Sequence, residues 1–515
     1  MHGYGETVNT GAVRANTRTA FAFLAVPAPY ALAVVVLGAF VLRLTLALTH
    51  EGQLGPDGGA YLLSAQHWLY RLGLWAHDVP TVDVSRPPLS PGLWLGAFIK
   101  PFGLDMGFRL FTAVGSIVPV LCCIPLFRRF LSPWQVVAAT ALLAVDMNWA
   151  EMTVTGVLPL IGFGLFALIL WGLCGLTKEW RWREALTVVA VVPLLAFTNQ
   201  TATGLAFICI SIFVLFLFFT KGMEYIDGMA AAVVAGGILA LASLWWYAFP
   251  GTDKTLSYPG PVVYLTHGFG FVWWQMAALG TLAILAIRKA RDIRLRAIGV
   301  LSIALVLLMP WASYDESVMN IFYRARFLAP IPTVLLGTWA YARYVAPQWR
   351  PVALASLAVT VALAGLLGWA WEFRGQASAG DMVTPAVAPM VEYVRDNPNG
   401  AVLTNGFSLS LWTAALTGEK TYWTWQIKPP LQYQAEDEVV RCALGWVATC
   451  TPAEAVRQLG VGYVLTDARM QLPANVGPTK IPLYGAPSQN PWNQPIPNAT
   501  LVMQDGTAKL WKLNG

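Results

Sequence analysis

The sequence predicts a polytopic α-helical membrane protein of about eleven transmembrane helices, followed by a C-terminal extracytoplasmic α/β domain. The first observation is composition, because 57% of the 515 residues are hydrophobic and only 12% are charged, about half the charged fraction of a soluble chain. The second is a series of apolar runs of about 20 residues, the length that crosses a bilayer. The third is a drop in hydrophobicity after residue 374, where Pro, Asn and Gln become frequent.

The apolar runs place the expected spans one after another along residues 1–374. They are Pro29–Thr49, Gly107–Phe127, Trp134–Ala150, Val154–Leu176, Ala185–Phe197, Gly204–Thr220, Ile226–Tyr247, Phe269–Ile287, Ala297–Trp311, Phe327–Ala346 and Val352–Trp371. The 23 Trp and 17 Tyr residues are typical of long aromatic belts at the membrane interfaces. The net charge of +6 requires no nucleic-acid partner, since most Lys and Arg residues fall in the short loops.

The basic residues of those short loops all fall on one side of the spans. They are Arg128 and Arg129, Lys178 to Arg183, Lys221, Arg288 to Arg296, and Arg343 with Arg350. By the positive-inside rule, this side is the cytoplasm. The N-terminus is then cytoplasmic and the loop after the first span is outside. Since the number of spans is odd, everything after Trp371 is outside as well.

The first outer loop, residues 50–106, belongs to the membrane domain and has its own helical pattern. Apolar residues recur at helical spacing over Ala60–Leu72, which predicts an amphipathic helix. Pro91–Phe102 predicts a second helix. Both are too short to cross the bilayer, so we expect them to lie along the membrane surface.

Residues 375–515 predict a second domain of α/β type. The runs Ala401–Thr404 and Gly462–Thr466 are typical of buried parallel strands. A helix is expected between them at Ala453–Leu459, another at Met390–Val394, and a closing strand at Lys509–Leu513. A domain of this length can hold its own core.

The six cysteines divide into two groups. Four lie within apolar runs, where a thiol acts as a small packing residue. Cys442 and Cys450 lie in the polar C-terminal part, where an extracytoplasmic location would favour a disulfide between them. Spacing alone leaves the alternative of two free thiols open. The five His residues show no metal-ligand spacing.

Asp57 is the candidate catalytic residue. It lies just beyond the first span and is followed by Gly58 and Gly59, which let a substrate approach the backbone closely. A carboxylate at the mouth of a low-dielectric cavity can accept a proton from an acceptor hydroxyl. The alternative is a helix N-cap, for which Asp is a preferred residue, and both roles can hold at once.

Three arginines are candidates for binding a phosphate. Arg86 precedes Pro87 and Pro88, which fix the direction of the chain after it. Arg324 and Arg326 open the tenth expected span from the outer side, against the positive-inside trend, and an anionic ligand supplies a reason for them. A guanidinium recognises phosphate through two parallel hydrogen bonds. The alternatives are headgroup contact for Arg86 and an ion pair with a nearby acid for the other two.

Further polar residues fall at the outer ends of the spans. Asp146 and Glu151 lie at the outer end of the third span and could position an acceptor or a metal, or equally be solvated residues of a loop tip. Asn199 and Gln200 could hydrogen-bond a sugar. Tyr61, on the first loop helix, is a further candidate for contact with the acceptor or the sugar.

The order of these elements resembles a known family. Asp57 with Tyr61 after the first helix, the turn from Asp83 to Leu89 around Arg86, and the Arg326-Phe327 entry to a late helix are similar to the C superfamily of polyprenyl-phosphate-sugar glycosyltransferases. The similar branches are the protein O-mannosyltransferases and the aminoarabinose transferases of lipid A. The resemblance covers most of the membrane part.

The resemblance implies a multi-pass enzyme of a bacterial-type plasma membrane. It would move a sugar from a polyprenyl-phosphate donor to a hydroxyl of a glycan, lipid or protein at the outer face, with inversion. Asp57 would be the base, and Arg86, Arg326 and Arg324 would bind the donor phosphate. No cofactor is expected, and a divalent metal is left open. The alternatives are a lipid-linked sugar flippase and a polysaccharide polymerase or ligase using lipid diphosphates. No pattern in the sequence identifies the sugar, the acceptor or the oligomeric state.

Overall fold

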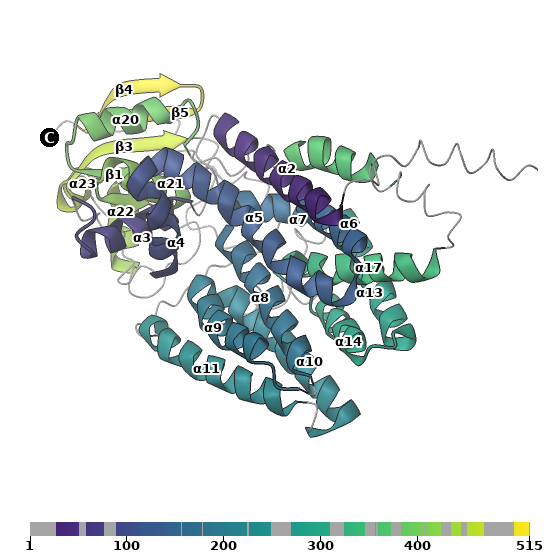
Figure 1. Ribbon diagram of the computed structural model, residues 1–515. Coiled ribbons are helices and arrows are strands. Elements are labelled where there is room, and N and C mark those ends of the chain that lie inside the picture. The colour runs from purple at the N-terminus through teal and green to yellow at the C-terminus, as the bar shows by residue number, and fades with distance from the viewer. Residues whose placement is uncertain are drawn as a thin grey trace, which may run out of the picture.

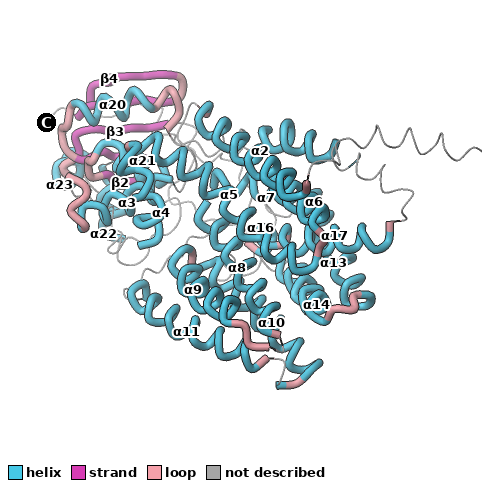
Figure 2. Tube along the Cα trace, in the orientation of Figure 1, coloured by secondary structure: helices cyan, strands magenta, loops and turns pink. Residues whose placement is uncertain are grey.

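The computed structural model consists of a helical bundle with a small β-sheet at one end (Figure 1). It describes residues 27–50, 58–76, 89–155, 157–177, 179–223, 226–248, 269–309, 324–345, 356, 359–371, 383–404, 407–423, 434–443, 451–467 and 499–513. Figure 2 shows the strands gathered in that one sheet and helices throughout the rest of the described chain.

Four helices of the described residues are long and apolar enough to cross a membrane. They are α2 (Ala28–Thr49), α5 (Leu104–Phe130), α8 (Val157–Leu176) and α10 (Gln200–Lys221). At about 1.5 Å per residue, each extends roughly 30 Å or more, the thickness of the hydrocarbon core. The most apolar stretch of α8 is 89% buried and that of α2 only 22%. Helix α8 is therefore central, and α2 lies at the periphery of the bundle.

Within the described residues, length and composition support four of the eleven expected spans as membrane-crossing helices. Further helices occupy the other expected spans. They are α6 (Pro133–Ala144), α7 (Met147–Thr155), α9 (Trp182–Thr198), α11 (Asp227–Ala248), α13 (Phe269–Lys289), α14 (Ile293–Leu308), α16 (Ala325–Leu328), α17 (Pro330–Tyr344) and the π-helix η5 (Ala364–Trp369).

The third expected span, Trp134–Ala150, is wrong as a single helix. Helix α6 ends at Ala144, and α7 begins three residues later. At the break, the carboxylate of Asp146 accepts hydrogen bonds from the backbone N–H groups of Asn148 (3.0 Å) and Trp149 (3.3 Å). Asp146 thus caps the new helix, because a carboxylate satisfies N–H groups that have no partner within the helix.

The two helices expected in the first outer loop are present. They are α3 (Gly58–Arg71) and α4 (Leu89–Phe102), and they pack on each other. The indole of Trp68 covers Gly92, where a Cβ would lie 2.7 Å from the ring. Helix α3 also packs on α21 (Phe407–Thr417) of the C-terminal part, so the loop joins the two parts of the molecule.

The C-terminal part contains a five-stranded sheet of order β2-β1-β3-β5-β4. The strands are β1 (Ala401–Thr404), β2 (Thr421–Trp423), β3 (Val461–Asp467), β4 (Ala499–Asp505) and β5 (Ala508–Leu513). The parallel pairing expected between β1 and β3 is confirmed. The expected closing strand is present as β5, but it lies between β3 and the edge strand β4, antiparallel to both. The expected helices are present as α20 (Ala388–Asp396) and α23 (Pro452–Leu459).

The two faces of the sheet are covered differently. On one face, Leu403 and Val464 pack with residues of α22 (Gln434–Ala443) and α23 in a small separate core. On the other face, Val402 and Leu465 pack with α20 and α21, and this core is continuous with the apolar interior of the helical bundle. The strands alternate sides residue by residue, which is why one short sheet contributes to both cores.

Cys442 on α22 is disulfide-bonded, whereas Cys122, Cys123, Cys174 and Cys209 are free thiols. The expected partner, Cys450, lies outside the described residues, so their pairing stays a prediction. We expect alkylation of denatured, unreduced protein to modify four cysteines, and all six after reduction. Mass spectrometry of the tryptic peptides measures this, and labelling of Cys450 before reduction would contradict it.

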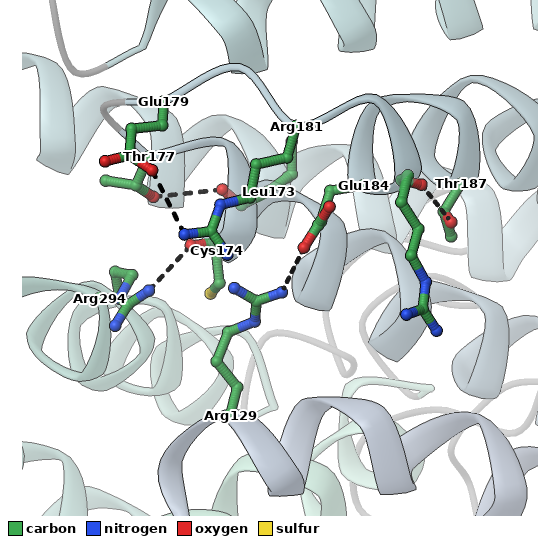
Figure 3. A network of polar contacts seen from close by, with 10 residues as sticks. Arg129, Leu173, Cys174, Thr177, Glu179, Arg181, Glu184, Thr187 and Arg294 are labelled. Atoms are coloured by element: carbon green, nitrogen blue, oxygen red, sulfur yellow. Dashed lines mark hydrogen bonds and ion pairs between the residues drawn. The ribbon is translucent and has the colours of Figure 1, made fainter.

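Three of the expected basic loops meet where α5 ends (Figure 3). Arg129, at the end of α5, forms an ion pair of 3.1 Å with Glu184 on α9, and Arg294 of α14 donates a hydrogen bond of 3.1 Å to the carbonyl of Cys174 on α8. The loops after α5, α8 and α13 therefore lie on one side, as the pattern of basic residues predicts. That this side faces the cytoplasm remains a prediction.

Candidate active site

Arg109 holds the end of the first span where the outer loop begins. Its Nη1 donates hydrogen bonds to the carbonyls of Ala47 (2.7 Å) and His50 (2.6 Å), and its Nε faces the carboxylate of Asp105 at 3.0 Å. The last carbonyls of α2 have no partner within that helix, so a guanidinium on α5 both caps α2 and fixes its direction. Residues 51–57 follow, and they include the candidate base Asp57.

Asp57 and Arg86 both lie outside the described residues. Their roles as base and phosphate ligand therefore remain predictions. What the structure describes is the support on either side of Asp57, since Arg109 fixes the chain before it and α3 begins directly after it.

The glycines after Asp57 are covered by α21. A Cβ on Gly58 would lie 2.2 Å from the ring of Trp412, and one on Gly59 would lie 2.5 Å from the backbone nitrogen of the same residue. Trp412 is fully buried, and its ring meets that of Phe108 edge to face at 5.4 Å. The glycines were expected to let a substrate approach the backbone, and a substrate contact at Gly58 and Gly59 stays a prediction. On the described side, it is α21 of the C-terminal part that packs against them.

This contact predicts that Gly59→Ala displaces α3 from α21. An added methyl group would overlap the backbone of α21, which cannot yield as a flexible side chain can, and overpacking of this kind costs about 1–3 kcal/mol. We expect a lower melting temperature and lower activity. The matched control is Gly280→Ala on α13, where nothing lies within 4 Å of the added atom. Equal stability of the two variants would contradict the prediction.

Tyr61 lies one turn further along α3, half-buried, and its contact with acceptor or sugar stays a prediction. On the same helix, Gln66 donates a buried hydrogen bond of 3.0 Å from Nε2 to the carbonyl of Ala415 on α21. Helix α3 is thus fixed to the C-terminal domain along much of its length.

Arg326 and Glu151 form an ion pair that ties α16 to α7. The guanidinium also lies over the ring of Phe327, 4.3 Å from its centroid. The same two helices are joined by a hydrogen bond of 2.9 Å from Trp149 Nε1 to the carbonyl of Phe327. Two residues to which we gave separate roles, in donor and in acceptor binding, are therefore in contact with each other.

Arg324 precedes α16 and is half-buried. Its Nη1 is buried and has no hydrogen-bond partner among the described residues. An unsatisfied buried donor on a charged group is costly, and an anion in the site would satisfy it. Binding of a phosphate by Arg324 stays a prediction, with which this buried donor is consistent.

Asp146 lies in the turn between α6 and α7, outside the four apolar helices listed above. Desolvation by burial raises the pKa of its carboxyl to about 6, although hydrogen bonds from Trp149 and Asn148 oppose the shift. A carboxylate with a pKa close to the working pH is suited to accept a proton. By exposed surface the residue is half-buried, so its role in the site stays a prediction beside the alternative of a loop-tip residue.

Asn199 caps α10, because its side-chain oxygen accepts a hydrogen bond of 2.8 Å from the N–H of Ala202. Because that oxygen already accepts a hydrogen bond within the protein, Asn199 would contact a sugar through its amide nitrogen. No side-chain contact is described for Gln200. The neighbouring Thr198 accepts a hydrogen bond of 3.3 Å from Trp94 Nε1 on α4, which brings the outer loop to this turn.

Metal binding remains open. Among the described residues, no three His, Cys, Asp or Glu side chains gather closely enough to hold an ion. Since Asp57 lies outside them, this does not decide whether the site takes a divalent cation.

Arg43 and Trp412 are the residues of this region that sequence reasoning missed. Arg43 is fully buried near the middle of α2 and donates a hydrogen bond of 2.8 Å to the carbonyl of Ala144. A lone charge within an apolar span is a signal that could have identified it. No sequence pattern identifies Trp412, because the glycines that its ring and backbone cover lie more than 350 positions earlier.

The fold is that of solved membrane glycosyltransferases. No protein-family model matches the sequence, and no curated protein does. The aminoarabinose transferase ArnT from Cupriavidus metallidurans superposes with a TM-score of 0.58 at 12% identity, over 93% of this chain and 97% of that one. The oligosaccharyltransferase AglB from Archaeoglobus fulgidus gives 0.58 at 12% identity, over 86% and 70%.

A third neighbour is the arabinofuranosyltransferase AftD from mycobacteria, with a TM-score of 0.55 at 18% identity over 95% of this chain and 42% of that one. The chain thus spans less than half of AftD. All three neighbours are glycosyltransferases of the C superfamily, so the resemblance noted in the sequence is confirmed at the level of the fold.

Proposed function

We propose that the chain is a membrane glycosyltransferase that moves a sugar from a polyprenyl-phosphate donor to an acceptor hydroxyl at the outer face of the membrane. The observation that carries this proposal is the superposition with ArnT over nearly the whole length of both chains. ArnT has also been solved with undecaprenyl phosphate bound, and AglB with dolichol-phosphate and a peptide. A polyprenyl-type lipid phosphate is therefore bound in structures of both ArnT and AglB.

The donor phosphate would bind at the arginines near α16. The buried Nη1 of Arg324 supports this location. Arg326, which pairs with Glu151, would have to exchange or share that partner with the phosphate. Arg86 would complete the site from the outer loop. Three cations around a phosphate that leaves with its charge lower the barrier, because they stabilise charge that develops as the glycosidic bond breaks.

Asp57 would accept the proton of the acceptor hydroxyl as its oxygen attacks the anomeric carbon. The bond to the lipid phosphate breaks on the opposite side of the sugar, so the configuration inverts. Glu151 is in contact with Arg326, and Asp146 caps the start of α7, the helix that carries Glu151. They would orient the acceptor, and they are the next candidates for the base.

Mass spectrometry of cells with and without the gene tests the proposal. Loss of the gene is expected to remove one sugar from a glycan, lipid or protein and to raise the level of the matching polyprenyl-phosphate sugar. Purified protein in vesicles should then restore transfer from that lipid. Movement of the intact lipid across the vesicle membrane without transfer would instead show a flippase and overturn the proposal.

A further inference from the structure

Arg43 is a positive charge buried in an apolar helix that is otherwise largely exposed. It is 1% exposed, and α2 has few other buried residues. No Asp or Glu of the described residues forms an ion pair with it. Because a charged side chain within a span is costly, such residues face the interior of the bundle and are associated with functional sites.

The contacts of Arg43 converge on the end of α6. Its Nη2 donates a hydrogen bond of 2.8 Å to the carbonyl of Ala144, the last residue of that helix, and its Nη1 donates one of 3.1 Å to Ala39 within α2. The last carbonyls of a helix lack partners within the helix and carry partial negative charge. Arg43 thus stabilises the helix end without an acid.

The π-helix η5 also contacts Arg43. The guanidinium of Arg43 lies 4.6 Å from the ring centroid of the fully buried Trp369. A Cβ on the neighbouring Gly368 would lie 3.4 Å from the sulfur of Met147, the first residue of α7. Short π-helical segments occur frequently at functional sites. Three elements therefore meet at the turn between α6 and α7.

That turn carries the acidic residues described above. Asp146 follows Ala144 by two positions, and α7 carries Glu151 to its ion pair with Arg326. The turn is non-helical at Val145, with φ −108° and ψ 12°. Its direction is therefore set by what holds the two helix ends.

We propose that Arg43 is a positioning residue for sugar transfer: its guanidinium fixes the turn between α6 and α7 and so places the carboxylates of Asp146 and Glu151. This inference rests on the proposed function. Without the cation, the carbonyl of Ala144 loses its donor and the turn can rotate. A displacement of about 1 Å in a catalytic arrangement can lower the rate by about 100-fold.

Arg43→Met tests the proposal, since Met is neutral and unbranched and fills much of the same space. We expect the kcat per folded molecule to fall by about 10–100-fold, with the KM for a polyprenyl-phosphate sugar changed far less. Hydrogen exchange of the peptide spanning α7 should accelerate. Arg43→Lys should recover part of the rate, because it keeps a cation that can reach the carbonyl of Ala144.

Arg129→Met is the matched control. Arg129 is also largely buried, but it lies in the last turn of α5 with Glu184. Its loss should lower the melting temperature and leave kcat per folded molecule unchanged. If Arg43→Met behaves in the same way, Arg43 is structural only and the proposal is overturned.

Two further outcomes are separable. If Arg43→Met does not accumulate, Trp369→Leu removes the ring from the guanidinium and should show the same loss of kcat in weaker form; a normal rate would overturn the proposal. If the wild-type protein transfers no sugar from any donor, the proposed function fails. The hydrogen-exchange comparison of α7 then still decides whether Arg43 holds the turn.

Discussion

Asp57→Asn is expected to lower sugar transfer by about 10²–10⁴-fold, the contribution typical of general-base assistance. The amide keeps the size of the carboxylate and most of its hydrogen bonds but accepts no proton at neutral pH. The variant should fold, insert and bind donor normally. Single-turnover transfer from a purified polyprenyl-phosphate sugar measures the chemical step directly.

The competing role of Asp57 as a helix cap gives a different result. Asn caps a helix about as well as Asp, so the variant would then be slightly less stable and turn over normally. Transfer at close to the wild-type rate would exclude Asp57 as the base. Asp146, with a carboxyl pKa raised to about 6 by burial, and Glu151 would then be tested next.

Arg326→Ala is expected to weaken donor binding by about 1.5–3 kcal/mol, the contribution of a charge-assisted hydrogen bond. This corresponds to roughly 10–150-fold in Kd. Arg326→Lys should recover only part, since an ammonium cannot form two parallel hydrogen bonds to phosphate. Arg86→Ala should show a loss of the same order. Binding of a polyprenyl-phosphate sugar to protein in nanodiscs measures both.

The ion pair with Glu151 requires a control for the Arg326 experiment. Glu151→Gln removes the carboxylate that faces the guanidinium, so it should leave donor affinity unchanged or increase it. The double variant Glu151→Gln/Arg326→Ala should lose the same affinity as Arg326→Ala alone. If Arg326→Ala lowers only the melting temperature, Arg326 joins two helices and does not bind the donor.

The sequence predicted the helices and strands whose pattern is local. The loop helices near Ala60–Leu72 and Pro91–Phe102 and the strands at Ala401–Thr404 and Gly462–Thr466 are present because periodicity and buried runs act over a few residues. The break at Asp146 was missed, since an acid that ends an apolar run looks the same whether the span ends or a new helix begins.

The site was predictable in its residues but not in their pairing. Glu151 and Arg326 are 175 positions apart. A single sequence does not show that a glutamate after the third span pairs with an arginine before the tenth. Nearer acids in the sequence were the natural alternative partners. The glycines after Asp57 were interpreted as space for a substrate, but on their described side α21, from far along the chain, packs against them.

The packing of α3 on α21 makes the C-terminal domain hard to exchange. Trp412 fits only a partner whose first turn is Gly58-Gly59, so a domain transplanted from a related enzyme would need a compatible loop helix with it. Expressed alone, the domain would expose the apolar face that is continuous with the bundle core and would be prone to self-association. In chimeras, α3, α4 and the C-terminal domain should therefore be taken together from the same parent protein.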